Sequence, residues 1–209
     1  NAIDVVERLD EDRACVRAEL RIPADARVYL HVGNEVLEKN HPRLLAIFDA
    51  AARVDPSAHL VLVGARTDRP DGTCGRLLEG LRAAPRVVRL GVGEDVPRLM
   101  AAADVLLLPS LLEGLPGVVL EACAAGVPVP ATDLPGVREI AIRLPLVRCL
   151  PLAGGDEEWA AAAFELAAEA SALELREHAA ERLRASVFHV DRAGEAYRAL
   201  WSHGAEGSA

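Results

Sequence analysis

Aromatic residues are scarce in this sequence. Phe, Trp and Tyr make up 3% of the 209 residues, whereas hydrophobic residues as a whole make up 51%. A core with so few large rings must be built from Ala, Val, Leu and Ile. This composition favours helices packed on a buried parallel sheet, and the length suits one substantial domain.

Long hydrophobic runs are also lacking. Charged residues, Gly or Pro interrupt each apolar run well before the ~18 residues that a membrane span needs, so we expect no transmembrane segment. The cysteines lack the spacing of a metal site, and no His lies at ligand spacing from a Cys or acidic partner. We therefore expect no metal, reduced thiols and a cytoplasmic location. The cysteines are Cys15, Cys74, Cys123 and Cys149.

Positive charge is in short supply. The formal net charge is -9 and the isoelectric point is about 5.2. An acidic surface argues against nucleic acid and anionic membranes as partners, so any phosphate must be held locally. Lys39 is the only lysine among 23 Lys and Arg residues.

The chain does not begin like a complete secreted or cytosolic protein. Asn1 is not an initiator, and no signal-like segment precedes the first expected helix. We expect a fragment or a processed chain that is ordered over residues 1–203. The Gly- and Ser-bearing residues 204–209 are expected to be a disordered tail.

Short apolar runs alternate with helical patterns along the chain. The first run, Val28–Val32, ends at Gly33, and a helical pattern follows over about residues 41–53. Similar runs lie at residues 59–63, 87–90, 105–108, 127–131 and 146–150, and further helical patterns at about 156–170, 173–185 and 192–201. Strands that are apolar on both faces and alternate with helices predict an α/β fold. It has a doubly wound parallel sheet of about six strands, helices on both faces and extra C-terminal helices.

One loop stands out as a candidate ligand site. Ligands bind beyond the carboxyl ends of the strands in open α/β sheets, and the segment from Pro109 to Glu121 leaves a strand there. It turns through Gly and Pro and enters a helix at about Gly117. The free amides and positive dipole end of a helix start can bind phosphate without basic side chains, which suits an acidic protein.

Two carboxylates flank this turn. Glu113 lies in the loop and Glu121 about one turn into the helix, so up to roughly 12 Å separates them at the rise of a helix. They cannot act as an acid and a base on one bond. The separation instead fits two ends of an extended ligand, each carboxylate accepting hydrogen bonds from a pair of hydroxyls.

The spacing of these glutamates resembles the E-x7-E motif of the family 4 retaining glycosyltransferases of GT-B fold. The neighbouring blocks resemble that family in the same order. They are DVLLLPS over 104–110, EGLP over 113–116, EACAAGVPV over 121–129 and ATD over 131–133. The opening NAID over 1–4 resembles the interdomain connector, so the likeness covers nearly the whole chain. It implies a Rossmann-like C-terminal domain that binds a nucleotide diphosphate sugar, with the N-terminal acceptor domain absent.

The resemblance also implies roles for single residues. Glu113 would hold the transferred sugar, with the backbone near Gly114, Leu115 and Pro116 holding sugar and diphosphate. Glu121 would hold the ribose. The start of the helix at Gly117 and Val118 would serve the diphosphate, and Gly91 and Val92 would line the base pocket. The alternative is that Glu113 and Glu121 are ordinary solvated residues.

The loop over residues 33–40 follows the family only in part. After Gly33 the family usually has an Arg, where this chain has Asn34, but Lys39 matches the Lys near the helix start. An ammonium beside the diphosphate would stabilise the negative charge that grows on the leaving group. Asn34 can donate a hydrogen bond but carries no charge. A lone surface lysine is the alternative interpretation of Lys39.

Other loops are less specific. Gly64 belongs to a Val-Gly segment similar to the family's and is equally explained as a turn residue. Glu94 and Asp95 are expected to cap the next helix. Ser110 lacks the setting of a hydrolase nucleophile and is expected to be a turn or cap residue. Pro130 lies inside a strand run, which is expected only near an edge or an irregularity.

The leading hypothesis is retaining glycosyl transfer from a nucleotide sugar without an obligatory metal, with a UDP-sugar as the expected donor. The acceptor would be a polysaccharide or glycoconjugate of a GC-rich bacterium. The isolated chain should bind the donor but hardly turn over, and any peripheral membrane contact would come through the absent half. A non-catalytic nucleotide-sugar-binding module is the second hypothesis, which the missing Arg at Asn34 supports. A GT-B epimerase or phosphorylase is a third.

Overall fold

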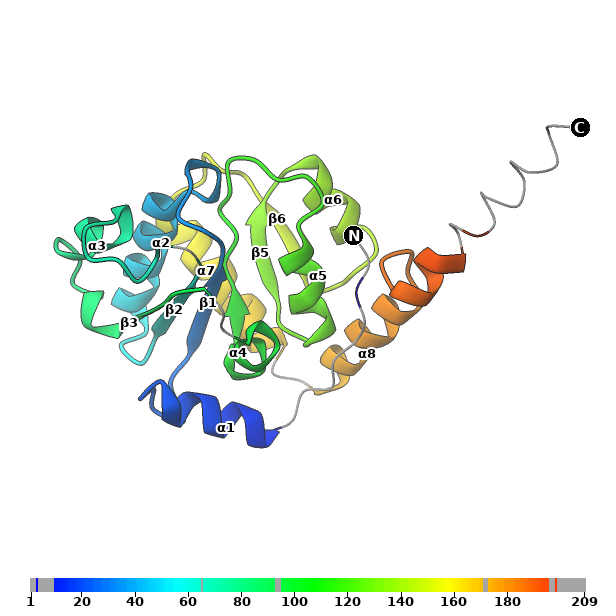
Figure 1. Cartoon of the computed structure of the whole chain (residues 1–209), viewed down its shortest axis with the longest axis horizontal. Helices are drawn as coiled ribbons and strands as arrows, with labels where there is room; N and C mark the ends of the chain where they lie inside the picture. Colours follow the sequence, from blue (N-terminus) through cyan, green and yellow to red (C-terminus); the bar gives the residue numbers. More distant parts are fainter. Residues whose placement is uncertain are drawn as a thin grey trace, which may run out of the picture.

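Six parallel strands form the centre of the described part of the chain (Figure 1). The computed structural model describes residue 3, residues 10–64, 66–92, 95–170 and 173–195, and residue 198. Four strands lie in the order β3-β2-β1-β4 and two more pair as β5-β6. Their bounds are β1 Val28–Val32, β2 His59–Val63, β3 Val87–Leu90, β4 Val105–Leu106, β5 Val129–Thr132 and β6 Val147–Leu150.

The two groups of strands meet at an irregular seam between β4 and β5. One isolated parallel bridge, between Leu108 and Ala131, joins them, so the strand order across the molecule is 3-2-1-4-5-6. Thr132 N donates to Leu108 O at 3.0 Å, and by strand alternation the nitrogen of Pro130 faces the same neighbour. Because that nitrogen carries no hydrogen, the ladder loses a bond there. The expected irregularity around Pro130 is confirmed.

Helices cover both faces of the sheet. On one face, α2 (His41–Val54), α3 (Thr73–Leu78) and α7 (Asp156–Glu169) pack on a core that includes Tyr29 and Leu60. On the other, five helices pack on a core that includes Leu30 and Val61. They are α1 (Asp10–Glu19), α4 (Val96–Ala102), α5 (Gly117–Ala124), α6 (Pro135–Ala141) and α8 (Leu173–Arg184). Alternate strand residues thus point into opposite layers, and the predicted doubly wound fold is confirmed.

Most expected elements match within two residues. The runs at 59–63 and 87–90 agree to the residue, whereas the run at 105–108 is shortened to β4 and the run at 127–131 begins later as β5. Helical backbone over residues 190–195 begins before the expected terminal helix and covers its first residues, but most of the rest of 192–201 and all of 204–209 lie outside the described residues. None of the helices in the described part of the chain is long and apolar enough to cross a bilayer.

Candidate ligand site at the carboxyl ends of the strands

The loops that follow β1, β2 and β3 lie side by side. Gly33 N donates to Val63 O at 2.8 Å, and Gly64 N donates to Gly91 O at 3.3 Å. Gly64 has a φ of +139°, and a Cβ there would overlap the Gly33 carbonyl. This close approach explains why Gly64 is a glycine. The structure therefore brings Gly91, expected in the base pocket, together with Gly33 and Gly64 from the two loops that resemble the family, and the neighbouring Val92 side chain is 71% exposed.

The loop between β1 and α2 places Lys39 at this edge. A short 3-10 helix, η1 (Leu37–Lys39), ends at Asn40, whose left-handed conformation, with a φ of 52°, turns the chain into α2. Asn40 Nδ2 donates to Pro109 O at 3.1 Å, which fastens this loop to the loop after β4. A Cβ on Gly33 would lie 3.1 Å from Lys39 Cδ, so the small residue leaves room for the lysine stem.

The two residues predicted to be catalytic are in direct contact. Lys39 Nζ lies 2.6 Å from Glu113 Oε1, and the two side chains are 22% and 10% exposed. Ser110 Oγ donates to the same oxygen at 2.7 Å. Ser110 is fully buried and is a partner of Glu113, but it lies in irregular backbone and neither forms a turn nor caps α5, contrary to the expectation from the sequence. The candidate site contains a cation and an anion that share one hydrogen-bond network.

The helix start behind Glu113 is open on its ligand side. α5 begins at Gly117, as predicted, and no side chain caps its first amides at Pro116. No acidic residue occupies its first turn, so no carboxylate neutralises the positive end. A Cβ on Gly114 would meet no atom within 4 Å. The uncapped start of α5 at Gly117 and Val118 therefore offers backbone donors, and the space beside Gly114 is what an anion needs.

Glu121 lies further along α5 and is half-buried. Burial raises the pKa of its carboxyl group above its ordinary value. Among the described residues, no side chain forms a hydrogen bond or an ion pair with this carboxylate. A partly desolvated carboxylate with spare acceptor capacity is suited to binding hydroxyl groups.

Asn34 is exposed beside Gly33 in the loop after β1. Its neighbour Glu35, which the sequence did not single out, accepts hydrogen bonds from the backbone amides of Thr73 and Cys74 at the start of α3. This carboxylate fastens the β1–α2 loop to the loop after β2. Because 38 residues separate Glu35 from Thr73, no local capping pattern could have predicted the contact.

Buried imidazoles lie beneath the Lys39 loop. His31 Nδ1 is 2.9 Å from Leu107 O, and its ring packs edge-on against His41 with 5.0 Å between centroids. Burial lowers the pKa of His31 to about 3, so this ring is neutral at ordinary pH.

Among the described residues, no group of three or more His, Cys, Asp or Glu side chains could hold a metal ion. The four cysteines are free thiols.

Asp95 caps α4, as expected, by accepting a hydrogen bond from Arg98 N, whereas Glu94 lies outside the described residues.

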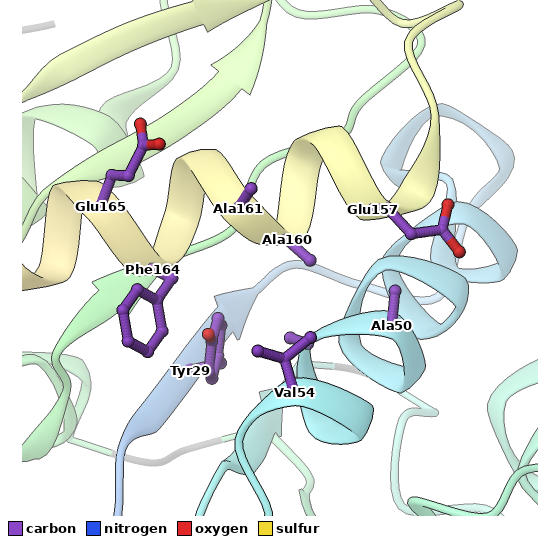
Figure 2. A pocket seen from close by; sticks show the side chains of 9 residues that line it. Tyr29, Ala50, Val54, Glu157, Ala160, Ala161, Phe164 and Glu165 are labelled. Atoms are coloured by element: carbon purple, nitrogen blue, oxygen red, sulfur yellow. The ribbon is translucent and has the colours of Figure 1, made fainter.

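A separate cavity of about 210 Å³ lies between α2 and α7 (Figure 2). Its lining includes Tyr29, which stands near the beginning of β1. The candidate ligand site lies at the other end of that strand.

A 3-2-1-4-5-6 parallel sheet with an uncapped helix start and polar side chains beyond its carboxyl edge defines a Rossmann-like ligand-binding domain. The family model described as glycosyl transferases group 1 matches residues 26–169. The chain belongs to this glycosyltransferase family, and its fold is the Rossmann-like fold of GT-B enzymes.

Known relatives agree with this assignment. The chain is 32% identical to N-acetyl-alpha-D-glucosaminyl L-malate synthase of Bacillus anthracis, over 67% of this chain and 36% of that protein. It is 30% identical to D-inositol 3-phosphate glycosyltransferase of Segniliparus rotundus, over 94% and 42%. The crystal structure of Anabaena HepE with UDP-glucose matches with a TM-score of 0.76 at 24% identity, over 97% and 56%. The chain thus spans less than half the length of both curated relatives.

Proposed function

We propose that this chain is the donor-binding part of a retaining glycosyltransferase and binds a nucleotide diphosphate sugar, with a UDP-sugar as its donor. The observation that carries the proposal is the meeting of Lys39, Glu113 and the open start of α5 at one edge of the sheet. A cation and free helix amides suit a diphosphate, and a carboxylate beside them suits sugar hydroxyls.

Each part of the donor then has a place. The diphosphate lies on the amides of Gly117 and Val118 and beside Lys39, and the sugar lies against Glu113 and the backbone of residues 114–116. The ribose lies against Glu121, whose carboxylate keeps its acceptor capacity. The base lies near Gly91 and Val92. Gly33, Asn34 and Gly64 line the same carboxyl end of the sheet beside the donor. HepE, which shares this fold, has been crystallised with UDP-glucose, which supports the choice of donor.

Transfer needs a further domain in this proposal. An N-terminal Rossmann-like domain supplies the acceptor surface for a polysaccharide or glycoconjugate, and any peripheral membrane contact is made through it. The 209 residues alone bind donor and hardly turn over. No metal is required, because Lys39 and the helix start neutralise the charge that develops on the leaving diphosphate.

Calorimetric titration of the chain with UDP, UDP-glucose, ADP-glucose and GDP-mannose tests the donor. We expect saturable binding of the uridine ligands without added divalent metal, and binding lost in Lys39→Met. Exposed Arg53 provides the matched charge control, since Arg53→Met should bind like the parent chain. If none of the four ligands binds, the proposal is wrong.

A non-catalytic nucleotide-sugar-binding module is the second candidate, and Asn34 favours it. This exposed amide stands where the resemblance places an Arg, so the charge available to the diphosphate is smaller. A transfer assay of this chain joined to an acceptor domain of the family distinguishes the enzyme from the binding module. Sugar transfer that disappears in Glu113→Ala supports the enzyme, whereas tight donor binding without transfer supports the module.

A further inference from the structure

Glu113 Oε1 has two donors of different character. Lys39 reaches it with an ammonium group on a flexible four-carbon stem, whereas Ser110 reaches it with a short hydroxyl from the same loop. The Lys39 side chain is 22% exposed, but Ser110 is fully buried. The Lys39 side chain can therefore move, whereas the Ser110 hydroxyl cannot turn into solvent.

The backbone on both sides of Ser110 is fastened. The carbonyl of Pro109 accepts the Asn40 side-chain amide at 3.1 Å, and Leu111 N donates to Glu38 O at 2.7 Å. Both contacts come from the loop that carries Lys39, so they persist when only the lysine side chain moves. Ser110 is thereby held at a fixed place relative to the Glu113 carboxylate.

A bound diphosphate competes for Lys39. Its negative charge is larger than that of one carboxylate, so the ammonium shifts toward it and its bond to Glu113 weakens. The Glu113 side chain is only 10% exposed, and water cannot fully replace the lost donor. Among the described residues, the buried hydroxyl of Ser110 is then the remaining side-chain donor to Glu113 Oε1.

We propose that Ser110 is a positioning residue that holds the Glu113 carboxylate against the sugar once the diphosphate has drawn Lys39 away. The inference rests on the proposed function and adds to it a division of labour. Ser110 acts on recognition of the sugar through Glu113 and leaves recognition of the nucleotide alone. A serine that only supported the loop would affect both ligands equally.

The ratio of two affinities tests this role in the 209-residue chain. Calorimetry with UDP and with UDP-glucose gives both dissociation constants for the parent, Ser110→Ala and Ser110→Thr. For Ser110→Ala we expect UDP to bind within about threefold of the parent and UDP-glucose to bind about 10- to 100-fold more weakly, as for loss of a hydrogen bond to a charged group. Ser110→Thr, which keeps the hydroxyl, should restore most of the ratio.

Ser57→Ala is the matched control, because it removes an exposed hydroxyl that donates to Asp55 far from the site. Equal weakening of both ligands in Ser110→Ala, or unchanged binding of UDP-glucose, overturns the positioning role while leaving the proposed function in place. If the parent chain binds neither ligand, the proposed function fails and this inference fails with it. Retained UDP binding in Ser110→Ala also demonstrates that the variant is folded.

Discussion

Gly136 packs directly on Gly114. A Cβ at position 136, in the first turn of α6, would overlap the carbonyl oxygen of Gly114 and lie 3.2 Å from Leu115 N. The start of α6, which follows β5, thus supports the segment that carries Glu113. The absence of a side chain at Gly136 sets how far that segment can sit toward the sheet.

Gly136→Ala is therefore expected to push residues 114–115 outward. We expect nucleotide-sugar affinity to fall at least about tenfold and the free energy of unfolding to fall by about 1–3 kcal/mol, as for overpacking at a tight contact. Calorimetry and urea unfolding measure the two effects. Exposed Gly80 is the control, since a Cβ there meets only Leu77 O at 3.9 Å. Donor binding equal to that of the parent chain would contradict the assigned role of the loop.

Glu121→Gln should change binding and stability in opposite directions. Burial raises the pKa of Glu121 in the folded chain, so its ionised form is favoured less there than in the unfolded chain. A group with a raised folded pKa contributes stability that is present at low pH and lost as pH rises through that pKa. Because this carboxylate is only half-buried and solvent screens it, removing the charge should raise the free energy of unfolding at pH 7 by well under about 1 kcal/mol and weaken UDP binding about tenfold.

Urea unfolding at pH 4 and pH 7 checks the stability half of this prediction. The gap between Glu121→Gln and the parent should widen toward pH 7, where Glu121 is ionised. Glu181→Gln, at an exposed position on α8, is the control and should change neither quantity. A variant that binds UDP as tightly as the parent would remove Glu121 from the ribose site.

The sequence predicts the order of strands and helices better than the contacts between their side chains. Strands β1, β2 and β3 match the expected runs because each is a short apolar segment that ends at a glycine. At β4 the same pattern runs two residues too far, because Pro130 withholds a ladder donor and the pairing with β5 is interrupted, whereas β5 has the bounds of its pairing with β6. Hydrophobic periodicity indicates which residues are buried. It does not indicate that a backbone hydrogen-bond donor is missing on the neighbouring strand.

The candidate site shows the same limit. Lys39 and Glu113 were both expected beyond the strand ends, but their 2.6 Å contact was not, because 74 positions separate them. Their meeting depends on the left-handed turn at Asn40 and on its bond to Pro109. The support given by Ser110 and Gly136 is equally tertiary. Their residue types are common in turns, so only the folded geometry distinguishes them.

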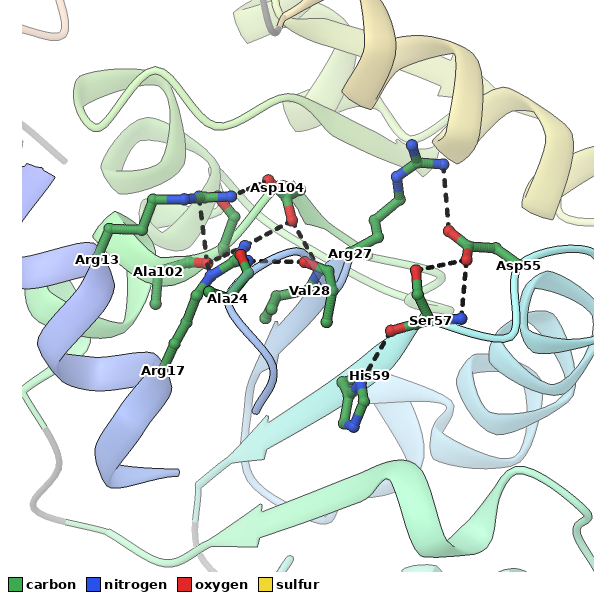
Figure 3. Close-up of polar contacts among 12 residues, drawn as sticks. Arg13, Arg17, Ala24, Arg27, Val28, Asp55, Ser57, His59, Ala102 and Asp104 are labelled. Atoms are coloured by element: carbon green, nitrogen blue, oxygen red, sulfur yellow. Dashed lines mark hydrogen bonds and ion pairs between the residues drawn. The ribbon is translucent and has the colours of Figure 1, made fainter. Parts of the chain in front are cut away.

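Asp104 joins α1 to the base of the sheet (Figure 3). Its carboxylate lies 2.6 Å from Arg13 Nη2 and 2.8 Å from Arg17 Nη2, and it accepts a hydrogen bond from Val28 N at 2.7 Å. Burial alone would raise the pKa of Asp104, but the two guanidinium groups and the Val28 amide outweigh it and lower that pKa. The Arg17 side chain is 3% exposed, so it depends on this partner.

Asp104→Asn should lower the free energy of unfolding at pH 7 by about 3–5 kcal/mol, because it leaves the Arg17 charge buried without its counter-ion. A carboxylate with a lowered folded pKa contributes stability above its unfolded pKa of about 3.9 and loses it as pH falls through the folded value. The difference between variant and parent should therefore shrink below about pH 4. Urea unfolding across pH 3–7 measures this difference.

Glu165→Gln is the control. It breaks an exposed pair with Arg148 and should lower the free energy of unfolding by less than about 1 kcal/mol. A pH-independent difference for Asp104→Asn would show that charge is not the cause.

Tyr29 presents the opposite case, a polar group whose loss should cost little. Its ring is fully buried and packs edge-on against Phe48 at 5.8 Å, while its hydroxyl has no hydrogen-bond partner of ordinary geometry among the described residues. Burial raises the pKa of Tyr29 to about 12. Figure 2 shows the side chain beside the cavity between α2 and α7, whose lining is mostly alanine, valine and phenylalanine side chains, with Glu157 and Glu165 as the carboxylates among them.

Removing this hydroxyl keeps the aromatic packing and removes a desolvated group that gains little in return. We expect Tyr29→Phe to leave the free energy of unfolding unchanged or to raise it by up to about 1 kcal/mol. Tyr29→Ala, which removes the ring as well, should lower it by about 3–5 kcal/mol. Urea unfolding of the three chains under one buffer measures both differences. A loss of more than about 1 kcal/mol in Tyr29→Phe would mean that the hydroxyl is held by a hydrogen bond, from the neighbouring Arg27 guanidinium or from a bound water, because only a satisfied hydrogen bond makes its removal costly.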